Sequence, residues 1–107
     1  MDHLHLVSEQ IEREALVSLH ACCPSDTKQA LGLELVEVAD GIAACSTKDP
    51  SILLNRTLGL GMTSPVTDQA VRQVHITYEK RSIDSYFLHV YQESLSASAQ
   101  TELRKFV

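Results

Sequence analysis

One short segment of this 107-residue chain has the residue types and spacing to hold an anion. Arg56, Gly59 and Gly61 form the pattern Arg-x-x-Gly-x-Gly at the end of an apolar run. Glycines after a strand let backbone N–H groups approach a phosphate without hindrance from a Cβ atom, and a following helix N-terminus attracts negative charge. The segment therefore predicts either an anion-binding loop or a structural turn in which Leu58 and Leu60 pack inward.

The distance from this loop to the next helix bears on that choice. Residues 62–66 separate Gly61 from the first good N-cap, Thr67 or Asp68. A phosphate-binding loop should lead directly into its helix, because the helix N-terminus supplies part of the attraction. The spacing therefore favours the structural turn.

The five histidines do not show metal-ligand spacing. His3 and His5 alternate in what we expect to be a frayed terminus, and His20 has no nearby carboxylate at ligand spacing. His75 falls on the apolar face of a predicted helix, and His89 lies in a predicted strand between apolar residues. We expect these two to be packed side chains, and we predict no metal site.

Composition and charge exclude several classes of partner. Nine Lys and Arg against fourteen Asp and Glu give a net charge of -5, which argues against nucleic acid or an anionic membrane. No apolar run approaches the roughly 18 residues of a membrane span, and the N-terminus lacks the pattern of a signal peptide. An odd cysteine count with two adjacent members (Cys22, Cys23 and Cys45) indicates reduced thiols. We therefore expect a cytoplasmic protein.

Periodicity predicts the elements on both sides of the loop. A first helix over residues 8–22, N-capped by Ser8, should pack through Ile11, Ala15, Leu16 and Leu19, leaving Glu9, Glu12 and Glu14 in solvent. Pro24 ends it, and residues 24–29 form a polar connector. Two β-favouring runs, 33–39 and 42–47, flank Asp40-Gly41, which is typical of a tight type I′ hairpin turn.

Further elements follow the hairpin. A third strand is predicted over about 52–58, a helix over 67–80, and a strand over 85–91 that is central or covered on both faces. A last helix starts near Ser96 or Ser98 and carries Leu103, Phe106 and Val107 toward a core, with no C-cap after them. The prediction is one α+β domain over 1–107: a small mixed, mainly antiparallel sheet of about four strands, in the order α-β-β-β-α-β-α. The uncapped end leads us to expect a fragment of a longer protein.

The motif and its surroundings carry a family resemblance. Asn55-Arg56-x-x-Gly59-Leu60-Gly61 is followed by Thr67-Asp68 opening a helix and Tyr86-Phe87-Leu88 opening a strand. In this pattern the chain resembles the N-terminal half of GNAT-superfamily N-acetyltransferases built from two GNAT-like halves. The resemblance covers about residues 10–107.

The resemblance implies an acyl-coenzyme A-dependent parent protein. Acetyl-coenzyme A is bound by the C-terminal half in such proteins, and the N-terminal half contributes packing and part of the acceptor cleft. This chain lacks that second half, so we expect it to be inactive alone and to bind no cofactor. Its expected partner is the missing half or a second copy of itself, most simply in a homodimer.

Two alternatives stay open. The chain could be a minimal acyl-coenzyme A-binding GNAT that uses Arg56, Gly59 and Gly61. It could instead be a non-catalytic interaction or dimerisation module.

Overall fold

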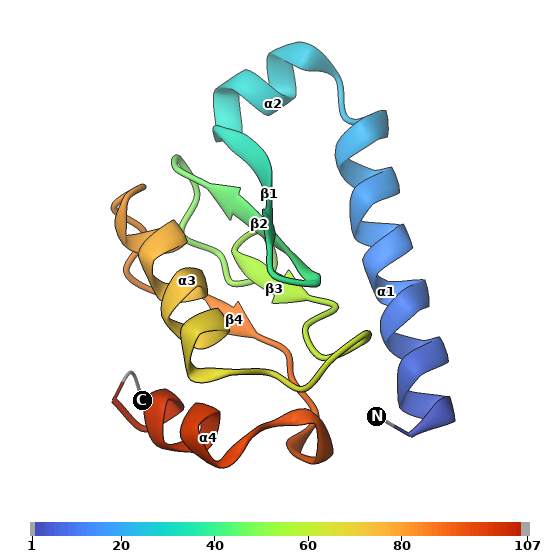
Figure 1. The fold of residues 1–107 in the computed structure, drawn as a ribbon. Helices are drawn as coiled ribbons and strands as arrows, with labels where there is room; N and C mark the ends of the chain where they lie inside the picture. The colour runs from blue at the N-terminus through green and yellow to red at the C-terminus, as the bar shows by residue number, and fades with distance from the viewer. Residues whose placement is uncertain (1, 106–107) are drawn as a thin grey trace.

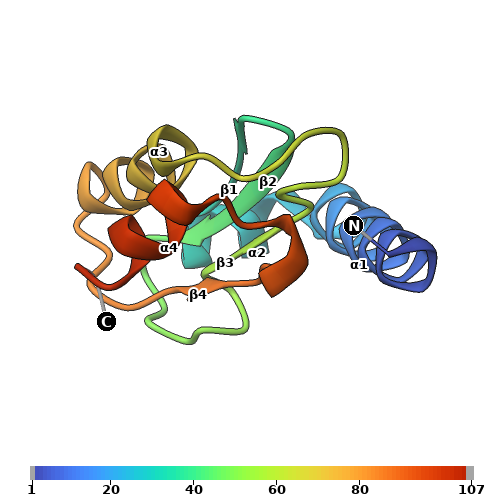
Figure 2. The same ribbon diagram turned by 60° about the horizontal axis from the view of Figure 1, so that its bottom comes forward.

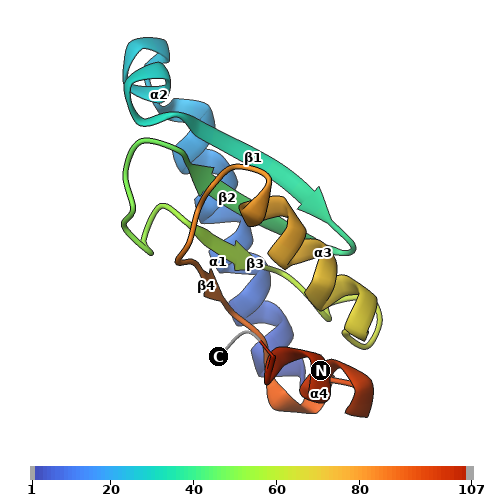
Figure 3. The same ribbon diagram turned by 90° about the vertical axis from the view of Figure 1, so that its left-hand side faces the viewer.

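Four strands form one open sheet with helices on both faces in the computed structural model, which describes residues 2–105 (Figures 1 and 3). The strand order is β1-β2-β3-β4; neighbours are antiparallel except β3 and β4, which are parallel. The strands are β1 (Leu33–Val38), β2 (Gly41–Ser46), β3 (Arg56–Leu58) and β4 (Phe87–Leu88). The helices are α1 (His3–Cys22), α2 (Ser25–Leu31), α3 (Asp68–Glu79) and α4 (Ala97–Leu103), with a 3₁₀ turn at Gln92–Ser94. The predicted α+β class is confirmed.

The central strand β2 divides the core into two layers. Ala43 and Cys45 face α3, whereas Ile42 and Ala44 face α1 together with Leu16. All six residues of β2 are buried, and its alanines allow a helix to approach from either side. Burial raises the pKa of the Cys45 thiol to about 11.

The hairpin of β1 and β2 is confirmed, but its turn lies one residue earlier than predicted. Val38 pairs with Gly41, so the two turn residues are Ala39 and Asp40. The positive φ belongs to Ala39, at 52°, and not to Gly41. Gly41 is needed for another reason: a Cβ there would lie 2.9 Å from both the Leu58 carbonyl oxygen and the Leu60 side chain.

The predicted third strand is too long. Only Arg56–Leu58 pairs with β2, and residues 52–54 form a turn. Asn55 closes that turn with its buried amide: Oδ1 accepts from the Ser46 N–H at 2.7 Å, and Nδ2 donates to the carbonyls of Asp49 and Ser51 at 2.9 Å each. These three hydrogen bonds give Asn55 its structural role.

The predicted strand 85–91 is reduced to Phe87–Leu88, and it is an edge strand, not a central one. The predicted alternation is right: Tyr86, Leu88 and Val90 pack on the α3 side of the core. Phe87 on the other face is 47% exposed. In the strand order β4 lies at the end of the sheet, paired with β3 on one side.

The first helix begins earlier than predicted and faces the other way. Asp2, not Ser8, is the N-cap, because its carboxylate accepts from the Leu4 N–H at 2.8 Å. Of the predicted packing residues only Leu16 is buried; the other three, Ile11, Ala15 and Leu19, are exposed. The inward face instead carries Glu9, Leu16 and His20.

Of the other three helices, α3 and α4 match expectation, whereas α2 was not expected. The predicted connector 24–29 is instead helix α2, whose end is closed by Gly32 in the left-handed region. Thr67 caps α3 through its hydroxyl, and Ser96 caps α4 in the same way. Figure 2 shows α4 packed across the end of α3. Leu103 packs on the core as predicted, whereas Phe106 and Val107 lie outside the described residues.

Candidate functional site

The glycine loop lies where the parallel strands β3 and β4 separate. Ladder bonds join them, among them one from the Phe87 N–H to the Asn55 carbonyl at 2.9 Å and one from the His89 N–H to the Thr57 carbonyl at 3.0 Å. The backbone then turns away at Gly59, where φ is 84°. Backbone pairing between the two segments resumes at the Val66–Leu95 bridge, so the ladder is interrupted between these two places.

A buried carboxylate from α1 lies at this interruption of the ladder. Glu9 is 1% exposed, and its Oε1 accepts from the Gly59 N–H at 2.8 Å. Its Oε2 lies 2.6 Å from Nδ1 of His89 on the other segment. Glu9 thus connects the two diverging segments, and the prediction that it lies in solvent is wrong.

A second carboxylate occupies the other end of the loop. Asp40 Oδ1 accepts from the Gly61 N–H at 3.0 Å, and Oδ2 accepts from the N–H and hydroxyl of Thr63 at 2.9 and 3.1 Å. Partial burial acts to raise the pKa of Asp40, but the N–H groups of Thr63 and Gly61 outweigh it, so its pKa lies below the ordinary value. The N–H groups of the loop thus donate to carboxylates of the chain itself.

The space beside each glycine is also taken. A Cβ on Gly61 would lie 2.8 Å from Cβ of Ser94, and one on Gly59 would lie 3.2 Å from Arg13. Residues 62–67 separate the loop from α3, which begins at Asp68. These contacts favour the structural turn over a phosphate-binding loop. Cofactor binding through Arg56, Gly59 and Gly61 stays a prediction.

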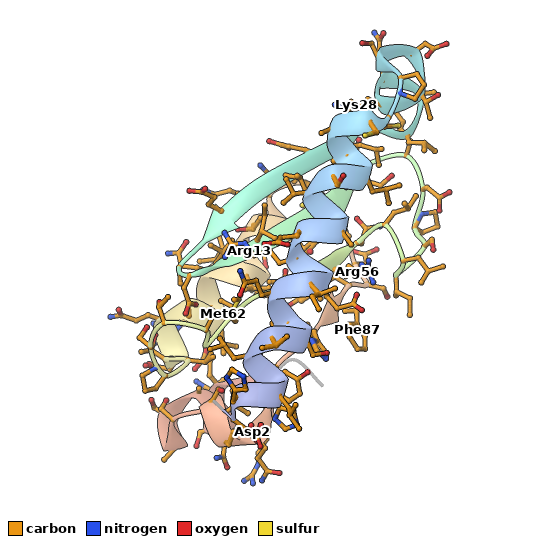
Figure 4. All side chains as sticks on the ribbon, turned by 90° about the vertical axis from the view of Figure 1, so that its right-hand side faces the viewer. Asp2, Arg13, Lys28, Arg56, Met62 and Phe87 are labelled. Atoms are coloured by element: carbon orange, nitrogen blue, oxygen red, sulfur yellow. The ribbon has the colours of Figure 1, made fainter. Side chains whose placement is uncertain are left out.

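Arg56 lies apart from the two glycines, in a crevice between α1 and the sheet. The crevice has a volume of about 250 Å³ and opens beside the Glu9–His89 pair. It is lined by α1, β3 and the segment that contains β4, through Ser8, Glu12, Arg56, Leu58, Phe87, His89 and Tyr91. In Figure 4, Arg56 and Phe87 lie together on one side of α1, opposite Arg13 and Met62.

The Arg56 guanidinium makes no hydrogen bond or ion pair with any group in residues 2–105, and its Nε is fully buried. Neighbouring carboxylates are engaged elsewhere or out of reach: the Glu9 oxygens contact Gly59 and His89, and Glu12 is exposed on the rim. The crevice therefore holds an unpaired, partly desolvated cation.

Aromatic rings continue from the crevice to the start of α1. Phe87, His89 and Tyr91 project to the same side of their segment, with centroids 6.2 Å and 5.2 Å apart. The His5 ring stacks on Tyr91 at 4.0 Å and pairs with Glu93. The expectation of a frayed terminus around His3 and His5 is therefore wrong.

Two further histidines, His75 and His20, are half-buried and buried, respectively. His75 contacts the Tyr86 hydroxyl at 3.2 Å and Glu79 at 2.9 Å, and His20 lies on the sheet side of α1. Within residues 2–105, no three His, Cys, Asp or Glu side chains are grouped closely enough to hold a metal ion. No helix in this part of the chain is long and apolar enough to cross a membrane.

The role of Glu9 was missed, although one signal pointed to it. Glu9, Leu16 and His20 are spaced i, i+7 and i+11, which places them on one face of a helix. That face carries less apolar surface than the Ile11 face, so periodicity selects the wrong side. Comparison of the chain with protein-family models, curated proteins and solved structures gives no significant match in any of the three.

Proposed function

We propose that this chain is the N-terminal GNAT-like half of an acyl-coenzyme A-dependent N-acetyltransferase. In this role it contributes scaffold and part of the acceptor cleft, and it binds no cofactor by itself. The order of strands and helices around Asn55-Arg56-x-x-Gly59-Leu60-Gly61 supports the proposal, because it follows the order expected for such a half.

The observation that carries the proposal is the occupation of the loop amides. The N–H groups of Gly59 and Gly61, which would face a pyrophosphate, donate to Glu9 and Asp40. A pyrophosphate would have to displace two carboxylates and would meet their charge. In the proposed parent protein the cofactor is therefore bound by the other half.

Calorimetric titration of the chain with acetyl-coenzyme A tests this role. We expect no saturable binding at tens of micromolar protein. Arg56→Met is a suitable companion variant, because the Arg56 guanidinium makes no hydrogen bond or ion pair within residues 2–105. A one-to-one isotherm in the wild type that this variant weakens would favour the minimal acyl-coenzyme A-binding GNAT instead.

A second candidate function, self-association, has its own support. The outer face of α1 carries exposed apolar side chains along its length, among them Leu4, Ile11 and Leu19, at 75%, 60% and 60% exposed. No element of residues 2–105 covers this face (Figure 1). Such a stripe on a 20-residue helix suits pairing with a second copy, in a closed twofold dimer.

A further inference from the structure

We propose that the crevice between α1 and β4 binds a small α-amino acid with an apolar or aromatic side chain, through a contact between its carboxylate and Arg56. The use of this crevice as the acceptor site rests on the proposed function.

Arg56 gives the crevice its positive charge. Only the Nε atom of this partly exposed guanidinium is fully buried, and it has no hydrogen-bond partner in residues 2–105 to offset its desolvation. Its planar fork of donors matches a carboxylate, which can accept two parallel hydrogen bonds. Within residues 2–105 no carboxylate pairs with Arg56: Oε1 of Glu9 accepts from the Gly59 N–H, and Oε2 of Glu9 lies against Nδ1 of His89. A ligand carboxylate would complete the pairing.

Part of the wall of the crevice is apolar and aromatic. Arg56 and Phe87 are directly paired in the parallel register, so their side chains lie next to each other on the α1 side of the sheet (Figure 4). Phe87 is 47% exposed, and Leu58 and Tyr91 line the same space. A ligand held by its carboxylate at Arg56 would place an apolar group against these side chains.

The crevice has the size of an amino acid and carries a negative charge on its rim, at Glu12. About 250 Å³ is below the roughly 300–1,000 Å³ of pockets for drug-sized ligands, so the crevice suits a molecule of amino-acid size. Glu12 on the rim offers a carboxylate to an ammonium group. A cation at Arg56 and an anion at Glu12 match the two charges of an α-amino acid.

The fixed floor supports a defined pose. Glu9, itself 1% exposed, lies against Nδ1 of His89 and so orients the imidazole that lines the crevice. His89 is 32% exposed at its side chain, so the ring also faces the open space. A ligand would therefore meet, in His89, a lining side chain that is already oriented by a contact within the domain.

Titration of the isolated chain with three probes tests the site, with ligand-observed NMR as the measurement. The probes are L-phenylalanine, L-phenylalaninamide, which lacks the carboxylate, and 3-phenylpropionate, which lacks the ammonium. We expect L-phenylalanine to bind and the amide to bind about tenfold more weakly or not at all, as expected for a lost charge-assisted contact. Loss of the ammonium should weaken binding less.

Variants locate the interaction. Arg56→Met should abolish carboxylate-dependent binding, whereas Arg104→Met, which removes an exposed arginine on the last turn after α4, should leave it unchanged. Glu12→Gln should remove the preference for L-phenylalanine over 3-phenylpropionate. Equal binding of acid and amide, equal binding of inorganic phosphate, or an unaltered Arg56→Met variant would overturn the inference.

The outcomes separate this inference from the proposed function. No binding of any probe, together with no binding of acetyl-coenzyme A, rejects the amino-acid site and leaves the scaffold role standing. Binding of acetyl-coenzyme A that depends on Arg56, without amino-acid binding, rejects both.

Discussion

Oε2 of Glu9 lies 2.6 Å from Nδ1 of His89, where the parallel strands β3 and β4 separate. The other oxygen of the same carboxylate accepts the Gly59 N–H. One side chain from the first helix thus connects the two segments at the point where their ladder ends.

Replacing Glu9 by leucine should destabilise the domain by about 2 kcal/mol or more, because the buried Gly59 N–H loses its partner and Nδ1 of His89 loses its counter-group. Urea denaturation measures the change. Glu14→Leu, an exposed site on the same helix, is the matched control and should shift the midpoint little. Similar midpoints for both variants would contradict the structural role of Glu9.

The hairpin turn gives two opposite expectations. Gly41→Val should cost roughly 1 kcal/mol or more, because its Cβ would meet the Leu58 carbonyl and the Leu60 side chain at 2.9 Å. Ala39→Gly should instead stabilise by about 0.5 kcal/mol, because glycine adopts the positive φ of 52° without strain. Thermal and urea unfolding of both variants would show the pair of effects. A neutral Gly41→Val would contradict the close approach of Gly41 to Leu58 and Leu60, and a destabilised Ala39→Gly would contradict the positive φ at Ala39.

Mild acid should destabilise the domain through His20. Burial, with a smaller contribution from the nearby Lys28 charge, lowers the pKa of His20 below its ordinary value. The unfolded chain therefore binds a proton at a higher pH than the folded one, so stability falls as pH drops below about 6.5. His20→Leu should flatten this dependence in urea midpoints measured from pH 7.5 to 5.

The exposed His3→Gln serves as the comparison and should retain the wild-type slope. The lowered pKa of Asp40 acts in a lower window, below its ordinary value near 4, and does not contribute in this range. Equal slopes for His20→Leu and the wild type would rule out His20 as the cause.

The outer face of α1 should drive self-association. Light scattering behind size exclusion, over a hundredfold range of concentration, should show a dimer for the wild type. Ile11→Glu should give a monomer whose urea midpoint equals that of the dilute, monomeric wild type, since Ile11 is 60% exposed and contributes little to the domain's own core. A monomer mass at every concentration for the wild type would reject the pairing.

Local signals predicted the parts of the fold that local physics determines. The Asp40-Gly41 dipeptide indicated the hairpin, and Thr67 with the periodicity of residues 71–78 indicated α3. Both depend on hydrogen bonds between residues close in sequence. The shortening of the third strand was not predictable in this way, because it depends on Asn55 bonding to Ser46 across the turn.

The candidate site shows the same division. Arg56, Gly59 and Gly61 stood out because they share one short segment. Glu9 did not, since its partners lie 50 residues away at Gly59 and farther still at His89, and only the folded sheet brings them to the same helix face. The orientation of α1 was misjudged for a related reason: its most apolar face packs against nothing in residues 2–105.

The burial of Cys45 has a practical consequence. Cys22 is exposed and Cys23 partly so, whereas Cys45 is fully buried between β2 and α3 and its thiol pKa is raised to about 11. Thiolate is the species that alkylating reagents attack, so Cys45 is protected twice, by access and by protonation. Two thiols therefore label at once, and the third reacts only when the sheet and α3 come apart. The rate at which Cys45 is modified therefore measures how often the sheet and α3 separate.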